Sequence, residues 1–294
     1  QSLMQYERCI VKMRRSMPDA VSPTGFTWPG NAAQVPKAVF QRDDIYAEEM
    51  ARIFGGPEWH LIAHRAEVPE SGDFKAVQVG EASVLLVHGD DGTLRVFENS
   101  CPHRGTQLKT CSQGNGREIE CPYHRWRFDI RGELLNAPGV EHFPDSFAKE
   151  DYGLVSLRLA EHCGLIFVTR QDAAPPLEDY LGEAGGFLIK AMQGDGRLKL
   201  LGYQKVAFAT NWKEYNDQEG YHAPLLHSAF RLLGWLGGKG SRCVSAYGHL
   251  SVEADLKQIG NTDFLKDPSL VLTHDQTRAP RTDTRPRMLD FLPG

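Results

Sequence analysis

The chain has 294 residues, a length that suggests about two domains. Its 41% hydrophobic and 24% charged residues are typical of a globular protein, and its net charge of −5 argues against nucleic acid as a partner. No apolar stretch approaches the ~20 residues of a membrane span, and the first twenty residues lack the features of a signal peptide. The sequence therefore predicts a cytoplasmic protein with no membrane partner.

The N-terminal residues 1–44 are predicted to form a helical segment. Residues 1–20 have the pattern of an amphipathic helix, and a second helix is expected from Asp44 to Phe54.

Three predicted hairpins indicate that residues 45–172 form an all-β domain. Each hairpin has two short apolar or β-branched runs around a turn that contains glycine. The paired strands are 83–88 with 93–97, 128–130 with 133–135, and 156–160 with 165–168. The stretch Ala173-Ala174-Pro175-Pro176 then predicts a linker, so residues 173–294 are expected to form a second domain.

Two short motifs in the β domain indicate a metal centre. The first is Cys101-Pro102-His103, and the second is Cys121-Pro122-Tyr123-His124. Two thiolates can hold one iron of a [2Fe–2S] cluster while two neutral imidazoles hold the other, which is the ligand set of a Rieske centre. The alternatives are a Cys2His2 zinc site, which usually keeps its cysteine and histidine pairs separate, and four unrelated residues.

The residues around these motifs favour a cluster of low reduction potential. Respiratory Rieske proteins carry an extra cysteine in each loop, and here Thr106 and Tyr123 occupy those positions. Trp126 and Phe128 stand where hydroxyl residues would donate hydrogen bonds to the cluster. Rieske potentials span about −150 to +300 mV, and the low end suits delivery of electrons to a demanding acceptor.

Three arginines beside the motifs have two open interpretations. They are either ordinary surface charges or a docking site for an acidic electron donor. These residues are Arg104, Arg125 and Arg127.

A second metal site is predicted in the second domain, at His222 and His227. Five residues separate side chains by ~140° on a regular helix, which is poor for joint ligation. Pro224 lies between the two histidines and disrupts the regular turn, so both rings could reach one ion. Beside an electron-carrying cluster, the pair is best interpreted as the site that receives its electrons.

With both motifs in place, the whole chain resembles the large (alpha) subunit of a Rieske non-haem iron ring-hydroxylating oxygenase. The resemblance rests on the two cluster motifs, on Asn211-Trp212-Lys213, and on Glu219-x-x-His222-x4-His227. It is nearest to the aromatic-acid subgroup, such as the salicylate and terephthalate oxygenases. It implies an α+β fold, with an N-terminal all-β Rieske domain followed by a helix-grip catalytic domain of antiparallel sheet and helices.

The same resemblance implies the cofactors and partners. The cofactors would be a [2Fe–2S] cluster on Cys101, His103, Cys121 and His124 and a mononuclear Fe(II) on His222 and His227. Electrons from NAD(P)H would arrive through a ferredoxin or a reductase, and O2 would attack a small aromatic, carboxylated substrate. The family assembles as a homotrimer or as α3β3 with a small subunit, and Glu219 would bridge to a cluster histidine of the neighbouring subunit.

The chain departs from the aromatic-acid subgroup in three respects, of which one is a shorter stretch between the Asn-Trp-Lys motif and the first iron histidine. Glu219 stands where that subgroup usually has aspartate, whereas glutamate is more typical of relatives that attack N-methyl ammonium compounds. A facial triad also needs a carboxylate ligand; Asp283 and Asp290 are weak candidates, and the ligand stays unidentified. Because the chain begins at Gln1 without methionine and ends at Gly294, segments are expected to be missing and the catalytic domain to be incomplete.

Two further functions therefore stay open. One is a Rieske monooxygenase or N-demethylase acting on a methylammonium compound. The other is a Rieske electron-transfer protein with an inactive second domain. An active-site lysine would favour a carboxylate substrate, and Lys213 is a candidate, although a structural lysine is the simpler interpretation.

Overall fold

The computed structural model describes residues 25–26, 35–192, 200–203, 205, 207, 209–217, 240–244 and 247–254. The chain divides into two compact units. The first consists of Tyr46–Asp179 and Asp195–Gly202, and the second of Gln1–Ile45, Tyr180–Gly194 and Tyr203–Gly294.

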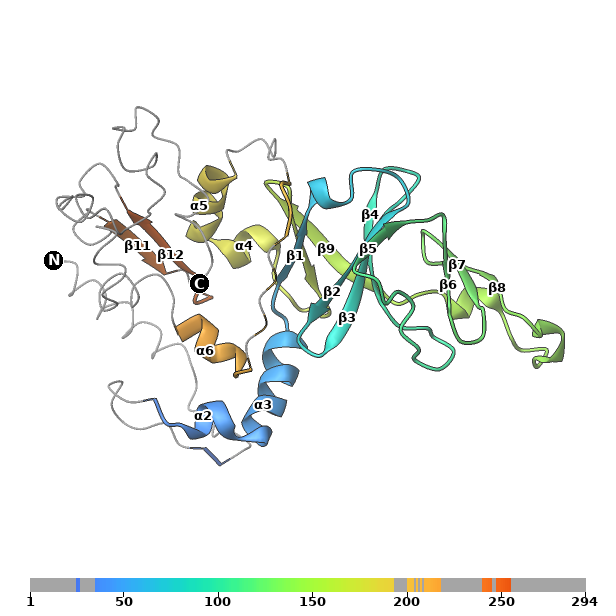
Figure 1. The fold of residues 1–294 in the computed structure, drawn as a ribbon, viewed down its shortest axis with the longest axis horizontal. Coiled ribbons are helices and arrows are strands. Elements are labelled where there is room, and N and C mark those ends of the chain that lie inside the picture. The colour runs from blue at the N-terminus through green and yellow to red at the C-terminus, as the bar shows by residue number, and fades with distance from the viewer. Residues whose placement is uncertain are drawn as a thin grey trace, which may run out of the picture. The chain divides into compact units, whose positions relative to one another are not determined.

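A seven-stranded antiparallel sheet forms the centre of the Tyr46–Asp179 unit (Figure 1). Its strands, in spatial order, are β1 (His60–His64), β10 (Leu165–Thr169), β9 (Ser156–His162), β4 (Leu94–Glu98), β3 (Ala82–His88), β2 (Asp73–Val79) and β5 (Gln113–Asn115). The β3–β4 and β9–β10 pairs are two of the three hairpins expected from the sequence, and both are confirmed.

Strand β3 is buried on both faces, which explains its unbroken apolar run. Successive strand residues point to opposite faces of a sheet. Leu85 and Val87 therefore join one buried cluster together with Cys101 and Cys121. Val84, Leu86 and other residues form a separate cluster on the opposite face. The two motif cysteines are thus part of the hydrophobic core on one face of the sheet.

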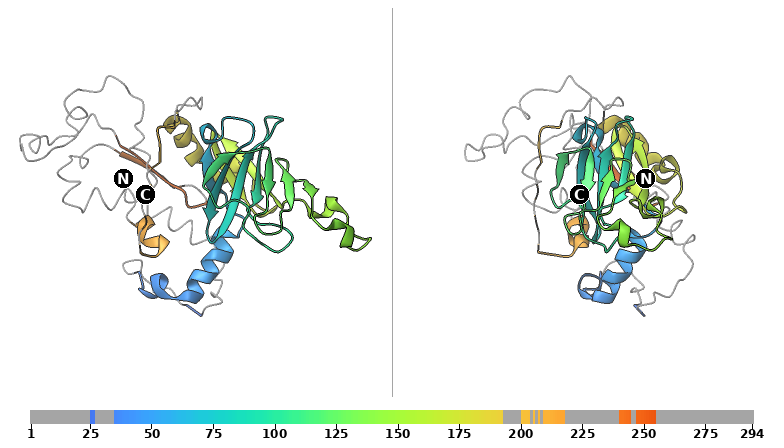
Figure 2. Two further views of the ribbon diagram at one scale, coloured as in Figure 1. Left: turned by 45° about the vertical axis from the view of Figure 1, so that its right-hand side comes forward. Right: turned by 90° about the vertical axis from the view of Figure 1, so that its right-hand side faces the viewer.

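A second, three-stranded sheet of the same unit carries the other motif. Its order is β6 (Glu118–Glu120), β7 (Arg127–Asp129) and β8 (Leu134–Asn136), all antiparallel. The β7–β8 pair confirms the third predicted hairpin. Figures 1 and 2 show this sheet beyond one end of the larger sheet. Two 3-10 turns follow it, η3 (Val140–His142) and η4 (Lys149–Tyr152).

The remaining elements are mostly helices. The helix expected from Asp44 to Phe54 is confirmed, as α3 (Asp43–Glu49) followed by a π-helical turn, η1 (Met50–Phe54); the helix expected over residues 1–20 lies outside the described residues. The other elements are α2 (Ala38–Gln41), η2 (Arg65–Glu67), α4 (Leu177–Leu181), α5 (Glu183–Ala191), α6 (Trp212–Asp217), β11 (Gly240–Val244) and β12 (Leu250–Ala254).

Antiparallel sheets with few helices confirm the predicted α+β class. The segment 173–176 is free of helix and strand, as expected for a linker. Within the described part of the chain, every helix is too short or too polar to span a bilayer.

Candidate metal centre

The first cluster loop, residues 100–109, follows strand β4 and closes on itself through backbone hydrogen bonds. The Cys101 amide donates to the Thr106 carbonyl at 2.8 Å, and the Gly105 amide donates to the Cys101 carbonyl at 2.8 Å. Gly105 has φ +75°, in the left-handed region that glycine adopts without strain. The loop therefore makes a tight turn that returns the chain beside Cys101.

The second cluster loop, residues 121–126, joins β6 to β7 and repeats this pattern. The Cys121 amide donates to the Trp126 carbonyl at 2.8 Å, and the Arg125 amide donates to the Cys121 carbonyl at 3.1 Å. Arg125 occupies the position equivalent to the glycine of the first loop and has φ +60°. A residue with a Cβ is strained there, by about 1–2 kcal/mol. The two loops thus share one backbone path although their histidines are spaced differently.

A buried asparagine anchors the first loop. The Asn99 side chain accepts a hydrogen bond from the Lys109 amide at 2.9 Å and donates to the Lys109 carbonyl at 2.7 Å. It also donates to the Ser83 hydroxyl at 3.0 Å. Because only 3% of Asn99 is exposed, these partners are not easily replaced by water. Asn99 therefore fixes the start and the end of the loop to β3.

The two thiols lie on the buried side of the loops. Cys101 is 2% exposed and Cys121 is 1% exposed. Burial raises the pKa of the Cys101 thiol, while the His103 backbone amide hydrogen-bonds it and opposes that shift; the thiol also hydrogen-bonds Cys121. A ferric ion between the thiols would reverse the balance, since a coordinating thiol is deprotonated.

The two imidazoles lie on the outer side of the same loops. Their ring centroids are 4.8 Å apart, with His103 exposed and His124 partly exposed. Desolvation lowers the pKa of His103, and the charges of His124 and Arg104 lower it further. The neutral imidazole favoured by these effects is the form that binds metal. A buried thiol pair below an outer imidazole pair fits a two-iron cluster with mixed ligands.

A zinc site would need four donors around a single ion. Within the described ranges, no group of three or more His, Cys, Asp or Glu side chains is placed to hold one metal ion.

Aromatic rings pack against both histidines. The Trp126 ring stacks on His103 with centroids 4.8 Å apart and an angle of 6° between the planes. Tyr123 covers His124 at 3.9 Å with a tilt of 33°. Trp126 is 2% exposed, whereas Tyr123 is 62% exposed. The ring that packs on His103 is thus buried in the core, whereas the ring that packs on His124 is exposed to solvent.

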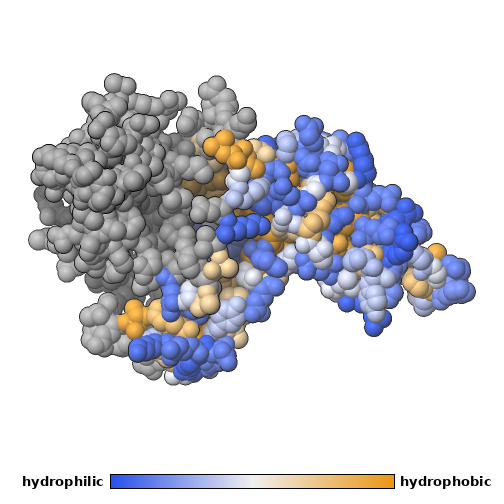
Figure 3. Space-filling model, viewed as in Figure 1, coloured by the Kyte–Doolittle hydropathy of each residue, from blue (hydrophilic) through white to orange (hydrophobic). Residues whose placement is uncertain are grey.

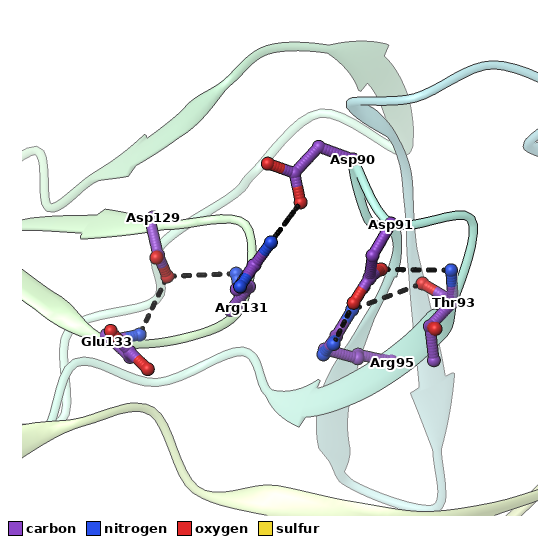
Figure 4. Close-up of polar contacts among 7 residues, drawn as sticks. All are labelled: Asp90, Asp91, Thr93, Arg95, Asp129, Arg131 and Glu133. Atoms are coloured by element: carbon purple, nitrogen blue, oxygen red, sulfur yellow. Dashed lines mark hydrogen bonds and ion pairs between the residues drawn. The ribbon is translucent and has the colours of Figure 1, made fainter.

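A polar network links the β3–β4 turn to the β7–β8 turn (Figure 4). Arg131, in the β7–β8 turn, donates to Asp90 of the β3–β4 turn at 3.1 Å. Asp129 accepts from the backbone amides of Arg131 and Glu133 at 2.9 and 2.8 Å. Each turn lies at the end of β4 or β7 that is remote from its cluster loop, so the network ties the seven-stranded sheet to the three-stranded sheet.

The residues predicted for the mononuclear iron and for the inter-subunit bridge lie outside the described residues. These are Glu219, His222 and His227, together with Asp283 and Asp290. The preceding Asn211-Trp212-Lys213 is described and begins α6. The Asn211 side chain accepts from the Lys213 amide at 3.1 Å, which caps the helix. The Lys213 ammonium lies 6.0 Å from the Phe40 ring and 5.4 Å from the Trp212 ring, which favours its structural interpretation.

Sequence reasoning missed two contributors to the centre. Asn99 was not singled out, although a polar residue directly before a predicted cluster loop is a usable signal for an anchor. The aromatic residues Phe143, Phe147 and Tyr152 were also missed, yet their rings lie 5.8–6.1 Å from Trp126. Their density in a short segment without strands was the available signal.

Comparison with known proteins finds one matching family model and several relatives. The Rieske [2Fe–2S] domain model matches residues 58–149. The chain is 31% identical over 289 residues to the large oxygenase component of salicylate 5-hydroxylase from Ralstonia sp., covering 93% of this chain and 67% of that protein. It is 37% identical over 205 residues to the anthranilate 1,2-dioxygenase large subunit from Burkholderia cepacia, covering 67% of this chain and 48% of that protein.

Solved structures of related enzymes also superpose on the chain. Naphthalene 1,2-dioxygenase from Rhodococcus sp. with bound indole superposes with a TM-score of 0.66 at 28% identity, covering 76% of this chain and 54% of that chain. A quaternary ammonium Rieske monooxygenase, described with carnitine oxidation and inter-subunit electron transfer, gives 0.62 at 30% identity, covering 71% and 57%. The chain thus spans between 48% and 67% of the length of these four proteins.

Proposed function

Since this chain belongs to the large subunits of Rieske-type ring-hydroxylating oxygenases, we propose that it is the oxygenase component of a multicomponent system that hydroxylates or dihydroxylates a small aromatic substrate. The observation that carries the proposal is the pair of matching loops with thiols inside and imidazoles outside. Cys101 and Cys121 would hold the inner iron of the [2Fe–2S] cluster, and His103 and His124 the outer iron.

Proteins of this family pair the cluster with a mononuclear iron, which would supply O2 activation with electrons from the cluster. In this chain His222 and His227 would bind that iron, with a carboxylate ligand that is not identified. The role of the loops is to keep the thiols dry while leaving the outer histidine pair near the surface. Electrons can then enter or leave through the imidazole side of the cluster.

The substrate is proposed to be an aromatic acid. Two relatives with long matches are named for salicylate and anthranilate, which both carry a carboxylate beside a second ring substituent. Oxidation of a methylammonium compound is the second candidate, favoured by Glu219 and by the likeness to a quaternary ammonium monooxygenase. Products separate the two: ring hydroxylation gives a phenol or cis-dihydrodiol, and N-demethylation releases formaldehyde.

The proposed electron donor is an acidic ferredoxin or an NAD(P)H-dependent reductase. Residues 100–127 carry five Lys or Arg and two Glu, although the chain as a whole has a net charge of −5. Arg125 pairs with Glu120 at 3.0 Å, but Arg104 lies over the exposed Tyr123 ring at 6.0 Å. The surface of this unit is mostly hydrophilic in the view of Figure 3. A weakly basic, polar surface beside the cluster suits a transient acidic partner.

Glu219 is proposed to connect subunits in a homotrimer or an α3β3 assembly. It lies three residues before His222, on roughly the same side if this stretch is helical. A carboxylate there can accept a hydrogen bond from a cluster histidine of the next subunit. Glu219→Gln should keep both metal sites and slow reoxidation of the reduced cluster by substrate and O2. An unchanged rate in single-turnover stopped-flow would remove the bridging role.

Iron analysis and product analysis test the proposed function together. The protein should contain three irons per chain, of which His222→Ala removes one along with all oxygenation while the visible absorption of the cluster persists. Two irons and no product in the wild type would instead support an electron-transfer protein with an inactive second domain. Survival of oxygenation in His222→Ala would show that the active site lies elsewhere.

A further inference from the structure

Trp126 connects the two cluster loops although its backbone belongs to only one of them. Its ring lies parallel to His103 of the first loop, with an angle of 6° and a centroid distance of 4.8 Å. Only 2% of Trp126 is exposed. A nearly parallel stack between a buried ring and an exposed histidine restricts how that histidine can turn.

The back of Trp126 is held by a second layer of rings. Phe143 and Phe147 each lie 6.1 Å from it, and Tyr152 lies 5.8 Å from it. Phe147 in turn packs on Phe143 at 4.8 Å and on Tyr152 at 4.6 Å. Trp126 therefore cannot turn without disturbing three other aromatic side chains, and its position is set by the hydrophobic core.

His124 has no comparable support. Its stacked ring, Tyr123, is 62% exposed and tilted by 33°. The ring of Tyr123 is approached by the Arg104 guanidinium at 6.0 Å, a surface contact. One histidine of the pair is thus fixed by the core, and the other is covered by a surface side chain.

We infer that Trp126 is a positioning residue that fixes the His103 ring for ligation and keeps water from that side of the cluster, which lowers the reduction potential. The inference rests on the proposed ligation of the cluster by His103. A ferric pair with two sulfides, two thiolates and two neutral imidazoles is uncharged, and its one-electron reduced form is an anion. Water stabilises the anion more than the neutral form, so the apolar Trp126 ring over one face of the otherwise exposed His103 disfavours reduction.

Variants of Trp126 test this inference through the potential and the spectrum, separately from activity. Trp126→Met retains apolar volume without a ring, and Trp126→Phe retains a smaller ring. The midpoint potential at fixed pH should rise from wild type to Phe to Met. The electron paramagnetic resonance g values of the Met variant should shift or broaden, because His103 gains freedom. Tyr123→Leu is the matched control and should move both quantities less than Trp126→Met.

A wild-type potential and spectrum in Trp126→Met, or a change no larger than that of Tyr123→Leu, would overturn the inference. If the Met variant does not fold, Trp126→Phe decides: a potential that rises by more than that of Tyr123→Leu supports the inference, and an unchanged one overturns it. Absence of a Rieske signal in the wild type would instead contradict the proposed function, so the two failures are distinguishable.

Discussion

The first and second cluster loops have the same backbone but different surroundings. Both close through a cysteine amide that donates five residues ahead and a turn amide that donates back to the cysteine carbonyl. The first loop places its histidine two residues after the cysteine and is anchored by Asn99. The second places it three residues after and carries Trp126. Backbone repetition thus brings four ligands together, while side chains outside the motifs make the two halves unequal.

The largest expected effect comes from removing a ligand from either loop. Cys101→Ser in the first loop and His124→Ala in the second should each lose the cluster, because a two-iron centre needs both donors on each iron. Visible absorption and iron content measure the loss, and circular dichroism reports the fold. Cys111→Ser is the matched control, since Cys111 is exposed and lies between the loops. Retention of the cluster in both ligand variants would show that the two loops are not its ligands.

Asn99→Ala should weaken the first loop specifically. It leaves the Lys109 amide without its side-chain acceptor, removes one of two donors to the Lys109 carbonyl, and deletes a group that is 3% exposed. Unsatisfied buried groups cost about 1–3 kcal/mol, so unfolding in urea should occur at clearly lower concentration. Gln107→Ala serves as the control, because its hydrogen bond to the Lys109 carbonyl is exposed. Equal midpoints for the two variants would contradict the anchoring role.

The equivalent turn positions should respond differently to substitution. A Cβ at Gly105 would meet only the Ser100 hydroxyl at 3.9 Å, so Gly105→Ala should cost about 1–2 kcal/mol from its positive φ alone. Arg125→Gly should change stability by about 1 kcal/mol or less, because relief of strain offsets the added freedom of the unfolded chain and the loss of an exposed ion pair. Denaturant unfolding of both variants measures the difference. Similar losses for both would mean that the turns are not equivalent.

Asp91→Asn should have a small, pH-dependent effect on the β3–β4 turn. The Arg95 side chain hydrogen-bonds Asp91 and holds the pKa of that carboxyl well below its usual range, and the Thr93 amide adds to the effect. The stabilisation is therefore present above the unfolded-state pKa near ~4 and is lost as the pH falls below it. The difference in Tm between wild type and variant should shrink on acidification. A difference that stays constant between neutral pH and the acid range would remove the ion pair as its cause.

Local patterns in the sequence were sufficient for the hairpins. Apolar runs and glycine turns predicted the β3–β4, β7–β8 and β9–β10 pairs. This was possible because a hairpin joins two strands that are adjacent in the sequence. The stacking of Trp126 on His103 could not be predicted in this way. It joins residues of two loops and depends on rings contributed by Phe143, Phe147 and Tyr152. From the sequence, Trp126 was noted only as a residue that stands where a hydroxyl side chain would donate a hydrogen bond to the cluster.

The second metal site illustrates a different limit. His222 and His227 were selected because a cluster needs an electron acceptor and because of the family resemblance, since five-residue spacing alone favours a structural pair. That assignment stays a prediction, as does the role of Glu219. The structure shows Asn211 as the cap of α6, a local role that was not predicted from the sequence.

Electron paramagnetic resonance of the dithionite-reduced protein tests the central claim most directly. Histidine ligation of one iron predicts a Rieske signal whose average g value lies below that of an all-cysteine [2Fe–2S] cluster. The signal should disappear in His103→Ala and in His124→Ala, one variant for each loop, while Cys111→Ser retains it. A signal typical of all-cysteine ligation, or a Rieske signal that persists in both histidine variants, would contradict the account.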